Sequence, residues 1–437
     1  MAANEHLTSR EFQNSDGMRD WRALGWGAAA WFKAPSHRAG AALVRRVAGL
    51  VESAGGTLPD LDLRASGLQV RLPRSEEGFT AQTTALARAI SAAADELGLT
   101  ADPSVVQDVQ LAIDAMDRDA VLPFWEEVLG YQREGEDDLV DPLRRHPAIW
   151  FQQQDRPRPL RNRIHLDSVT AQPTAVAALR RVRHLGARAV DEHGYYATVA
   201  DAEGNEVDLL PLPEGADRWP GAETEDWRLV FAAVAAYPTR SVTQALEVAE
   251  TVAGLADEAG LPLRVDLRPG LVTIDSGKDR WEMDEGYQPL AARIQQAVRE
   301  LGLTAEVTKA RFVQVGIDAV DIAAVRAFWR AVLSYDEDPR VGVTDIIDPR
   351  GLNTTVFFQD LDASDVARRA QRNRIHVDVF VPDDQAQSRI AAAVAAGGAV
   401  VRDAGPEGWT LADPEGNEVD IAVFVGREEI WLAERSG

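Results

Sequence analysis

The amino-acid sequence predicts an α+β protein with mostly antiparallel sheets, in which one unit occurs twice. Three observations lead to this fold class. Motifs of residues 20–212 return in the same order in residues 226–425. Each copy begins with two alanine-rich helical patterns around a pair of strands. Each copy then continues with the order strand, helix, strands, and repeats that order once.

The repeat is visible as matched motifs whose separation grows from 204 to 212 residues along the chain. Loop insertions explain such a drift, because loops tolerate changes in length. The matched pairs are Asp62–Arg64 with Asp266–Arg268, Glu96–Ala101 with Glu300–Ala305, Phe124–Trp125 with Phe328–Trp329, Arg161–His165 with Arg372–His376, and Gly204–Asp208 with Gly416–Asp420.

The first part of each copy, residues 20–102 and 226–306, is expected to form one helix, two strands and a second helix. In the first copy the helices are predicted over 38–54 and 80–97, and the strands over 60–64 and 67–73. In the second copy the helices are predicted over 241–259 and 285–301, and the strands over 263–267 and 270–275.

The second part of each copy, residues 103–213 and 307–426, alternates short strands with helices. A strand at Val109–Ile113 leads to a helix that ends at Phe124–Tyr131. After further strands the order recurs, with a strand at 163–169, a helix at 172–186 and strands near 188–191, 195–200 and 206–210. The remaining pieces are an expected disordered leader (1–19), a linker (214–225) and a C-terminal tail (427–437).

Composition and charge exclude several classes of function. The formal net charge of −24, from 70 acidic and 46 basic residues, repels phosphate backbones and anionic membranes. No apolar run reaches the roughly 18–20 residues of a membrane span, and the polar N-terminus has no signal-peptide pattern. The absence of cysteine excludes disulfides, thiolate nucleophiles and zinc–thiolate sites. We therefore expect a cytoplasmic protein that binds neither nucleic acid nor a membrane.

Three motifs of the second part resemble the vicinal oxygen chelate superfamily of glyoxalase I, bleomycin-resistance proteins and extradiol dioxygenases. They are the helix end Phe124–Tyr131, the strand Arg163–Asp167 and the hairpin Asp201–Asp208. The second copy of the hairpin, Asp413–Asp420, reads Asp-Pro-Glu-Gly-Asn-Glu-Val-Asp, closer to that superfamily's usual Asp-Pro-x-Gly-Asn. The resemblance implies paired βαβββ modules that curl into a cup and hold a metal ion or a ligand.

The first part of each copy more weakly resembles pterin-4a-carbinolamine dehydratase, in its element order and in segments Gly56–Arg64 and Glu77–Thr80. That family carries a His-His-Pro element where this chain has Thr57-Leu58-Pro59 and, in the second copy, Leu261-Pro262-Leu263. Neither copy has a histidine in the matching segments. Because histidines would handle the protons of that reaction, we expect degenerate domains that keep only the fold, and an active dehydratase is the less favoured alternative.

One strand in each copy places three ionisable groups on the same face. Residues 164 and 166 point one way, whereas Arg163, His165 and Asp167 point the other. The second copy repeats the face with Arg374, His376 and Asp378. Such groups face solvent or a polar cup, since an apolar core would desolvate them at great cost. We favour the cup, with His165, His376, Asp167 and Asp378 as catalytic residues.

The resemblance also implies a set of metal ligands. It places Gln110 and Gln314 on the first strand of each region, His165 and His376 on the middle strand, and Asp208 and Asp420 where the superfamily's motif usually ends in glutamate. A fourth ligand is not evident: Gln152 and Gln359 are repeated near its place, but Phe151 and Phe358 compete for the position. The donors fit either a divalent metal ion of unknown identity or no metal at all. Without metal, the histidines would still serve as general bases.

The remaining polar and aromatic repeats are candidate substrate contacts. Tryptophans at helix ends more often pack in the core, so the two tryptophans of this set also have that interpretation. The candidates are Arg163, Arg374, Glu206, Glu418, Gln152, Gln359, Trp125 and Trp329.

Three classes of function remain open. The first is a small-molecule enzyme of the vicinal oxygen chelate type, with isomerase, lyase or ring-cleavage chemistry. The second is a non-catalytic protein that binds a small molecule, such as an antibiotic, and confers resistance. The third is an assembly module in which the dehydratase-like parts hold the cups together. The duplication favours either a monomer with internal pseudo-twofold symmetry or a homodimer.

Overall fold

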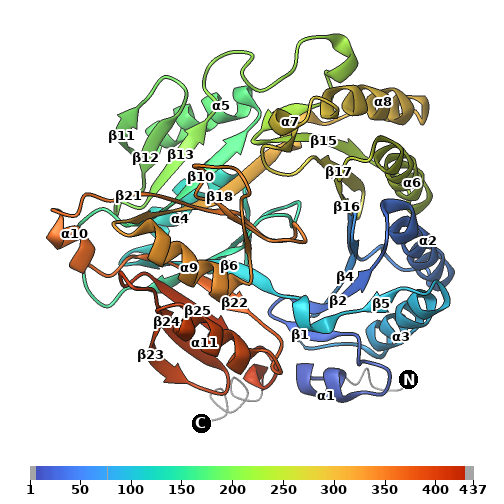
Figure 1. Ribbon diagram of the computed structural model, residues 1–437, viewed down its shortest axis with the longest axis horizontal. Coiled ribbons are helices and arrows are strands. Elements are labelled where there is room, and N and C mark those ends of the chain that lie inside the picture. The colour runs from blue at the N-terminus through green and yellow to red at the C-terminus, as the bar shows by residue number, and fades with distance from the viewer. Residues whose placement is uncertain (1–5, 76, 429–437) are drawn as a thin grey trace.

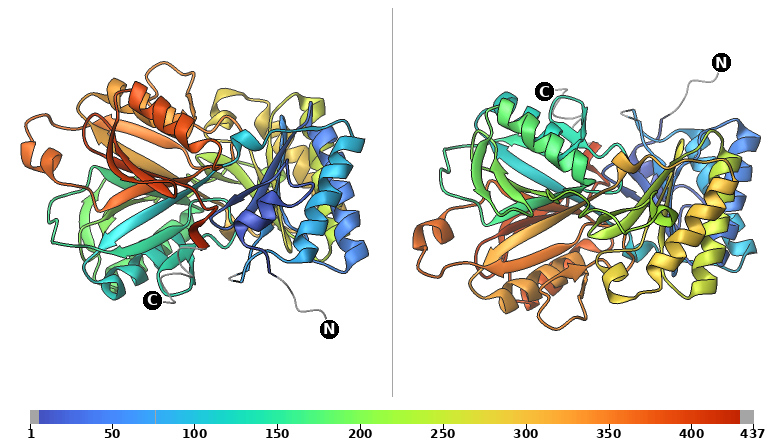
Figure 2. Two further views of the ribbon diagram at one scale, coloured as in Figure 1. Left: turned by 90° about the horizontal axis from the view of Figure 1, so that it is seen from below. Right: turned by 90° about the horizontal axis from the view of Figure 1, so that it is seen from above.

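The computed structural model describes residues 6–75 and 77–428, which fold into two lobes around three sheets. One lobe holds a nine-stranded sheet whose helices cover one face, and the other holds two eight-stranded sheets (Figures 1 and 2). The structure confirms the predicted α+β class and the twofold repeated arrangement. Within the described residues, no helix is both long and apolar enough to cross a membrane.

The nine-stranded sheet joins the first parts of both copies. Its order is β1-β2-β4-β3-β16-β17-β15-β14, with β5 paired to β2. The join is the antiparallel pair β3–β16, where Asp62 lies opposite Asp266. The strands are β1 (Arg22–Leu24), β2 (Gly27–Lys33), β3 (Asp60–Arg64), β4 (Gly67–Pro73), β5 (Thr100–Ala101), β14 (Arg228–Val230), β15 (Ala232–Pro238), β16 (Arg264–Arg268) and β17 (Leu271–Asp275).

Four long helices cover the outer face of this sheet: α2 (His37–Ala54), α3 (Ala81–Glu96), α6 (Val242–Ala259) and α8 (Tyr287–Glu300). Three of them begin at a serine or threonine cap, whose side chain accepts a hydrogen bond from a free backbone N–H group of the first turn. Glycines in the left-handed conformation follow α2 and α6. The alanines buried along these helices let α2 and α6 pack closely across the join between the copies.

Each eight-stranded sheet combines strands from both copies. The first has the order β11-β12-β13-β10-β18-β21-β20-β19, and the second β23-β24-β25-β22-β6-β9-β8-β7. The first sheet contains β10 (Ile164–Thr170), β11 (Arg188–Glu192), β12 (Ala197–Ala200), β13 (Glu206–Leu210), β18 (Arg311–Ala319), β19 (Asp336–Glu337), β20 (Ile346–Ile347) and β21 (Val356–Asp360). The second contains β6 (Asp108–Ala115), β7 (Gln132–Glu134), β8 (Asp138–Val140), β9 (Ile149–Gln153), β22 (Ile375–Phe380), β23 (Ala399–Ala404), β24 (Gly408–Ala412) and β25 (Glu418–Ala422).

The copies meet at the centre of each sheet through antiparallel pairs, β10 with β18 and β22 with β6. Inside each copy's contribution the pairing is partly parallel, as between β10 and β13 or β6 and β9. Helices α4 (Arg118–Leu129), α5 (Gln172–His184), α9 (Ile322–Leu333) and α11 (Ala386–Ala395) lie on the outer faces (Figure 1). The opposite faces carry the polar residues considered below.

Most of the expected leader is ordered, which corrects the expectation for residues 6–19. Helix α1 (Ser9–Asn14) begins with a capping box in which Thr8 and Glu11 exchange side-chain and backbone hydrogen bonds. Phe12 is fully buried and stacks on Phe79 at 4.2 Å between ring centroids. Phe12 and Met18 thus anchor an otherwise polar segment in the core. Residues 1–5 lie outside the described residues.

Candidate functional site

Two equivalent clusters of ionisable side chains lie on the eight-stranded sheets. The His165 cluster consists of His165 and Asp167 on β10 and Asp208 on β13. The His376 cluster consists of His376 and Asp378 on β22 and Asp420 on β25. In each cluster one nitrogen or oxygen atom per residue lies within 4.8 Å of the others. Parallel pairing sets this spacing, since Asp167 is the register partner of Asp208, and Asp378 of Asp420.

A glutamine from the other copy lies beside each cluster. Gln314 on β18 is the register partner of Asp167, and its Nε2 donates to Asp167 Oδ2 at 2.8 Å. Gln110 on β6 is likewise opposite Asp378, but its Nε2 donates to Asp108 Oδ2 at 2.6 Å. The structure therefore brings Gln314 to His165 and Gln110 to His376, so that each candidate ligand set draws on both copies.

Several oxygens in the clusters are buried without a hydrogen-bond donor. These atoms are Oδ1 of Asp167, Oδ1 of Asp378, Oδ1 of Asp420 and Oε1 of Gln314, and none accepts a hydrogen bond from the described residues. A buried acceptor without a donor costs about 1–3 kcal/mol. Carboxylate and amide oxygens beside one imidazole nitrogen are donors that a divalent cation accepts. The residues present therefore fit a divalent metal ion in either cluster.

Burial shifts the titration of the central aspartates. It raises the pKa of Asp167 to about 6, with the charge of Asp208 acting in the same direction and that of His165 opposing it. It also raises the pKa of Asp378 to about 6, and here Asp420 reinforces the shift and His376 opposes it. Each cluster thus concentrates negative charge in a place where solvent does not stabilise it.

An aromatic ring occupies the position where a fourth ligand was sought. The ring of Phe357 on β21 meets His165 edge to face at 5.6 Å, and that of Trp150 on β9 meets His376 at 6.3 Å. Trp150 Nε1 also donates to Asp378 Oδ2 at 2.6 Å. The expectation that Phe151 and Phe358 compete for this position is wrong, because strand alternation turns both into the apolar core.

Gln152 on β9 and Gln359 on β21 each form a hydrogen bond with a further aspartate. Gln152 donates to Asp114, and Gln359 donates to Asp318 Oδ1 at 2.6 Å. Asp114 Oδ1 is 3.9 Å from His376 Nδ1. Gln152 therefore acts on the His376 cluster through an aspartate and does not itself reach it.

The clusters differ in the residue beneath the histidine ring. Gly316 is the register partner of His165, whereas Ala112 is that of His376. A Cβ at Gly316 would lie 2.3 Å from His165 Cε1 and 2.6 Å from the Phe357 ring. The absence of a side chain at residue 316 is what allows the His165 and Phe357 rings to meet.

We expect Gly316→Ala to destabilise the protein by about 1–3 kcal/mol, because overpacking forces the two rings apart. Urea unfolding measures the change. Gly49→Ala on α2 is the matched control, since a Cβ there meets nothing within 4 Å and alanine favours helix. A stability of Gly316→Ala equal to that of Gly49→Ala would contradict this packing.

A cation from another part of the chain approaches each cluster. Lys278 follows β17, forms an ion pair with Asp345, and lies 6.0 Å from the Phe357 ring centroid. Its charge acts on Asp167. Arg427 approaches Asp378 in the same way and lies 5.4 Å from the Phe380 ring centroid. These cations partly balance the clustered carboxylates.

The predicted substrate arginines do not point into the clusters. Arg163 is 1% exposed, and it donates to Asn417 Oδ1 at 2.8 Å and to the backbone carbonyls of residues 368, 369, 371 and 416. Arg374 makes the equivalent bond to Asn205 Oδ1 at 2.8 Å. Each arginine precedes its strand and ties one copy to the hairpin of the other, so its donors are already engaged.

The remaining candidates lie at the rim or on the helical side. Glu206 and Glu418 pair with Arg161 and Arg372. Trp125 is fully buried, and its Nε1 donates to Asp201 Oδ2 at 2.9 Å. Trp329 does the same with Asp413 at 3.0 Å. Both tryptophans therefore pack beneath the hairpins, on the side away from the clusters.

Sequence reasoning missed Trp150, Phe357, Gly316, Lys278 and Arg427. Strand alternation could have found Trp150 and Phe357, since each lies two residues before a glutamine that was singled out. The sequence carries no local signal for Lys278, because it reaches its cluster from a loop of a different lobe.

Two stretches of the chain, residues 110–210 and 314–422, match the model of the glyoxalase-like domain family. No curated protein matches the chain in sequence. Among solved structures, glyoxalase I from Zea mays is 10% identical and aligns over 75% of this chain and 96% of its own, with a TM-score of 0.38. The cppA protein from Streptococcus pneumoniae TIGR4 is 8% identical over 73% of this chain and 98% of its own, with a TM-score of 0.32. Residues 110–210 and 314–422, which carry both clusters, each match the glyoxalase-like domain family.

Proposed function

We propose that the protein is a small-molecule enzyme of the vicinal oxygen chelate type that uses a divalent metal ion in each cluster. One observation carries the proposal. Each cluster gathers one imidazole and two carboxylates within 4.8 Å, and in each at least one buried carboxylate oxygen has no donor among the described residues. A purely structural cluster would pair these oxygens, because unpaired buried acceptors are costly.

The candidate ligands are Gln314, His165 and Asp208 in one sheet, and Gln110, His376 and Asp420 in the other. A divalent ion supplies polarisation of a substrate oxygen when it is bound there. Asp167 and Asp378 lie next to the histidines, with carboxylate–imidazole distances of 3.8 and 3.5 Å. At those positions they orient the imidazole ring, and their carboxylate oxygens are placed to accept a proton from a bound substrate.

The aromatic rings limit the kind of substrate. The rings of Trp150 and Phe357 lie next to the histidines. They favour a substrate that has a planar or apolar group beside the two oxygens that would chelate the metal ion. Isomerase, lyase and ring-cleavage reactions all fit a polarised oxygen beside a base.

A second candidate is a non-catalytic protein that binds a small molecule, such as an antibiotic. It is favoured by the aromatic ring at the fourth ligand position of both clusters. With three donors and an aromatic wall, the same site binds a ligand without turning it over.

We further propose that the first parts of the copies, residues 20–102 and 226–306, are degenerate dehydratase-like domains that act as a scaffold. Their support is the continuous nine-stranded sheet, which joins the copies through β3 and β16. Active dehydratase chemistry is not proposed, because the segments that would carry its histidines have none.

The test is the metal content of purified full-length protein, measured by elemental analysis after equilibration with Mn²⁺, Fe²⁺, Ni²⁺ or Zn²⁺ and desalting. We expect up to two metal ions per chain in the wild type, about one in His165→Ala or His376→Ala, and none in the double variant. The matched control is His184→Ala with His193→Ala, which removes two exposed histidines.

Metal that stays in the double His165/His376 variant would contradict the assigned ligands. If the wild type also retains no metal, while ligand affinity is unchanged in the double variant, both the metal and the histidine roles fail. Metal without turnover of any α-oxo, hydroxy or catecholic compound would favour the binding protein over the enzyme.

A further inference from the structure

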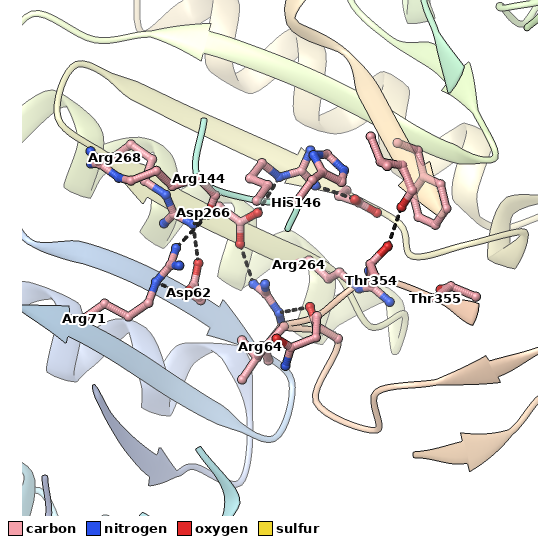
Figure 3. Close-up of a pocket in the computed structure, with 17 residues that line it drawn as sticks. Asp62, Arg64, Arg71, Arg144, His146, Arg264, Asp266, Arg268, Thr354 and Thr355 are labelled. Atoms are coloured by element: carbon pink, nitrogen blue, oxygen red, sulfur yellow. Dashed lines mark hydrogen bonds and ion pairs between the residues drawn. The ribbon is translucent and has the colours of Figure 1, made fainter. Parts of the chain in front are cut away.

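A small cavity lies between the two lobes, outside both clusters. It has a volume of about 30 Å³, which is room for about two water molecules or one small ion. Figure 3 shows its lining, to which the nine-stranded sheet contributes arginines and aspartates of both copies. The loop that follows β20 contributes Gly351, Thr354 and Thr355.

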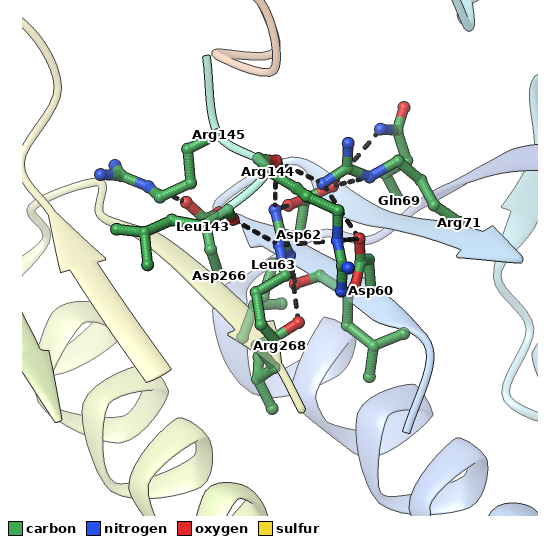
Figure 4. A network of polar contacts seen from close by, with 12 residues as sticks. Asp60, Asp62, Leu63, Gln69, Arg71, Leu143, Arg144, Arg145, Asp266 and Arg268 are labelled. Atoms are coloured by element: carbon green, nitrogen blue, oxygen red, sulfur yellow. Dashed lines mark hydrogen bonds and ion pairs between the residues drawn. The ribbon is translucent and has the colours of Figure 1, made fainter. Parts of the chain in front are cut away.

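At the centre of this lining the two copies exchange ion pairs symmetrically. Arg64 Nη1 donates to Asp266 Oδ1 at 2.7 Å (Figure 3). Arg268 Nη2 donates to Asp62 Oδ1 at 2.6 Å (Figure 4). The antiparallel register sets this exchange, because Asp62 and Asp266 face each other where β3 meets β16. Up to this point each charge in one copy has its counterpart in the other.

The symmetry between the two copies ends at the next ion pair, Asp60 with Arg144. In the first copy Asp60 accepts two hydrogen bonds of 2.6 Å from Arg144, whose φ is +49°. The equivalent positions of the second copy, at the same places on β16 and in the matching turn, are Arg264 and Gly351 (φ +62°). An aspartate–arginine pair has thus become an arginine beside a glycine. A carboxylate has been lost, and the volume of a side chain has been vacated.

This exchange leaves positive charge without an acceptor. Six arginines line the cavity against three aspartates, and Asp60 adds a fourth carboxylate through Arg144 and Arg268. Among the described residues the Arg264 guanidinium makes no direct hydrogen bond or ion pair, and the charges of Asp275 and Asp266 act on it only from a greater distance. Arg145 is buried and pairs with Asp266 and Asp275, but its Nη1 has no hydrogen-bond partner in the described residues. An arginine without a directly bonded carboxylate, beside a second arginine with one free donor, favours an anion in this half-enclosed space.

We propose that this cavity binds one small inorganic oxyanion, of the phosphate or sulfate type, between Arg264 and Arg145. The anion takes the place of the carboxylate that Asp60 supplies in the other copy. The cavity volume excludes a larger organic ligand. Because the lining comes from both copies and both lobes, the bound anion stabilises the assembled fold and does not take part in the chemistry of the clusters.

Gly351 keeps the space open. A Cβ there would lie 2.5 Å from Arg264 Nε, and its φ of +62° disfavours other residues. The first copy shows that an arginine is tolerated at the equivalent turn, since Arg144 adopts φ +49° there. The pair of the first copy can therefore be rebuilt in the second by the double substitution Arg264→Asp with Gly351→Arg.

The test is thermal unfolding of the full-length protein, exchanged into a zwitterionic buffer and titrated with sodium phosphate at constant ionic strength. We expect phosphate to raise the Tm of the wild type by at least about 2 °C, since a ligand that binds only the folded state stabilises it. The double variant should unfold in phosphate-free buffer no earlier than the wild type and should show no phosphate shift. Arg293→Gln, on the exposed surface of α8, should keep the full shift.

A second measurement does not depend on the double variant folding. Isothermal titration with phosphate should give one site per chain in the wild type, and the affinity should fall at least tenfold in Arg264→Gln. Equal phosphate shifts in the wild type and the rebuilt variant would overturn the proposal. It would also be overturned by a wild type with no saturable phosphate binding, in which case water alone fills the cavity.

Discussion

Expressed alone, residues 1–213 should not fold into a monomer. Strands β10 and β6 occupy the middle of different eight-stranded sheets, and each pairs along its length with a strand of the second copy, β18 or β22. Without those partners, both strands expose a long edge and an apolar face. Such edges either leave the chain unfolded or pair with another copy of the same fragment.

Sedimentation velocity and circular dichroism test this expectation on the isolated fragment. The control is co-expression of residues 1–213 with residues 214–437, which should give one folded complex of the mass of the intact chain. We expect the fragment alone to be unfolded or to form a homodimer in which strands equivalent to β6 and β10 pair between chains. A folded monomer of residues 1–213 would contradict the observed strand pairing.

Replacing Asp266 by asparagine should destabilise the protein by about 3–5 kcal/mol, because it leaves two buried arginines facing a neutral amide. Asp266 accepts hydrogen bonds of 2.7 Å from Arg64 and 2.6 Å from Arg145, and its side chain is 3% exposed. It lies where the nine-stranded sheet joins the two copies.

This loss should depend on pH. The charges of Arg64 and Arg145 hold the pKa of Asp266 well below its ordinary value of 3.8, against the opposing effect of burial. A depressed carboxyl pKa contributes stability that is fully present above the unfolded value and is lost as the pH falls below it. The difference in unfolding free energy between wild type and Asp266→Asn should therefore be constant from pH 5 to 8 and shrink below about pH 4.

Urea unfolding at several pH values measures both effects. Glu250→Gln is the control, because it breaks the more exposed pair with Arg45, and we expect it to cost less than about 1 kcal/mol. An Asp266→Asn protein as stable as Glu250→Gln would show that the buried network contributes little. A difference that grows in acid would reverse the assigned direction of the pKa shift.

The sequence predicts the local elements well, because hydrophobic periodicity and caps are local signals. Strands β3 and β4 and helix α2 lie within a residue of the expected bounds. The pairing of the copies could not be predicted in the same way. Since β6 and β18 have nearly the same pattern, Val109–Ile113 and Val313–Ile317, nothing local decides which of them lies beside His165.

The same limit applies to the candidate site. Alternation along a strand was enough to place His165 with Asp167, and His376 with Asp378, on one face. It was misleading for Arg163, which lies just before β10 and turns towards the hairpin of the other copy. Contacts such as that of Lys278 with Phe357 arise only when the two lobes pack together, and so they are beyond a local pattern.

The central claim is that a divalent metal ion lies between side chains of both copies. A crystal of the full-length protein grown with Mn²⁺ tests it most directly, through anomalous scattering at the manganese edge. We expect one peak beside His165, Asp208 and Gln314 and another beside His376, Asp420 and Gln110, at about 2.0–2.6 Å from the donor atoms. Absence of a peak at both positions, with excess Mn²⁺ present, would contradict the account.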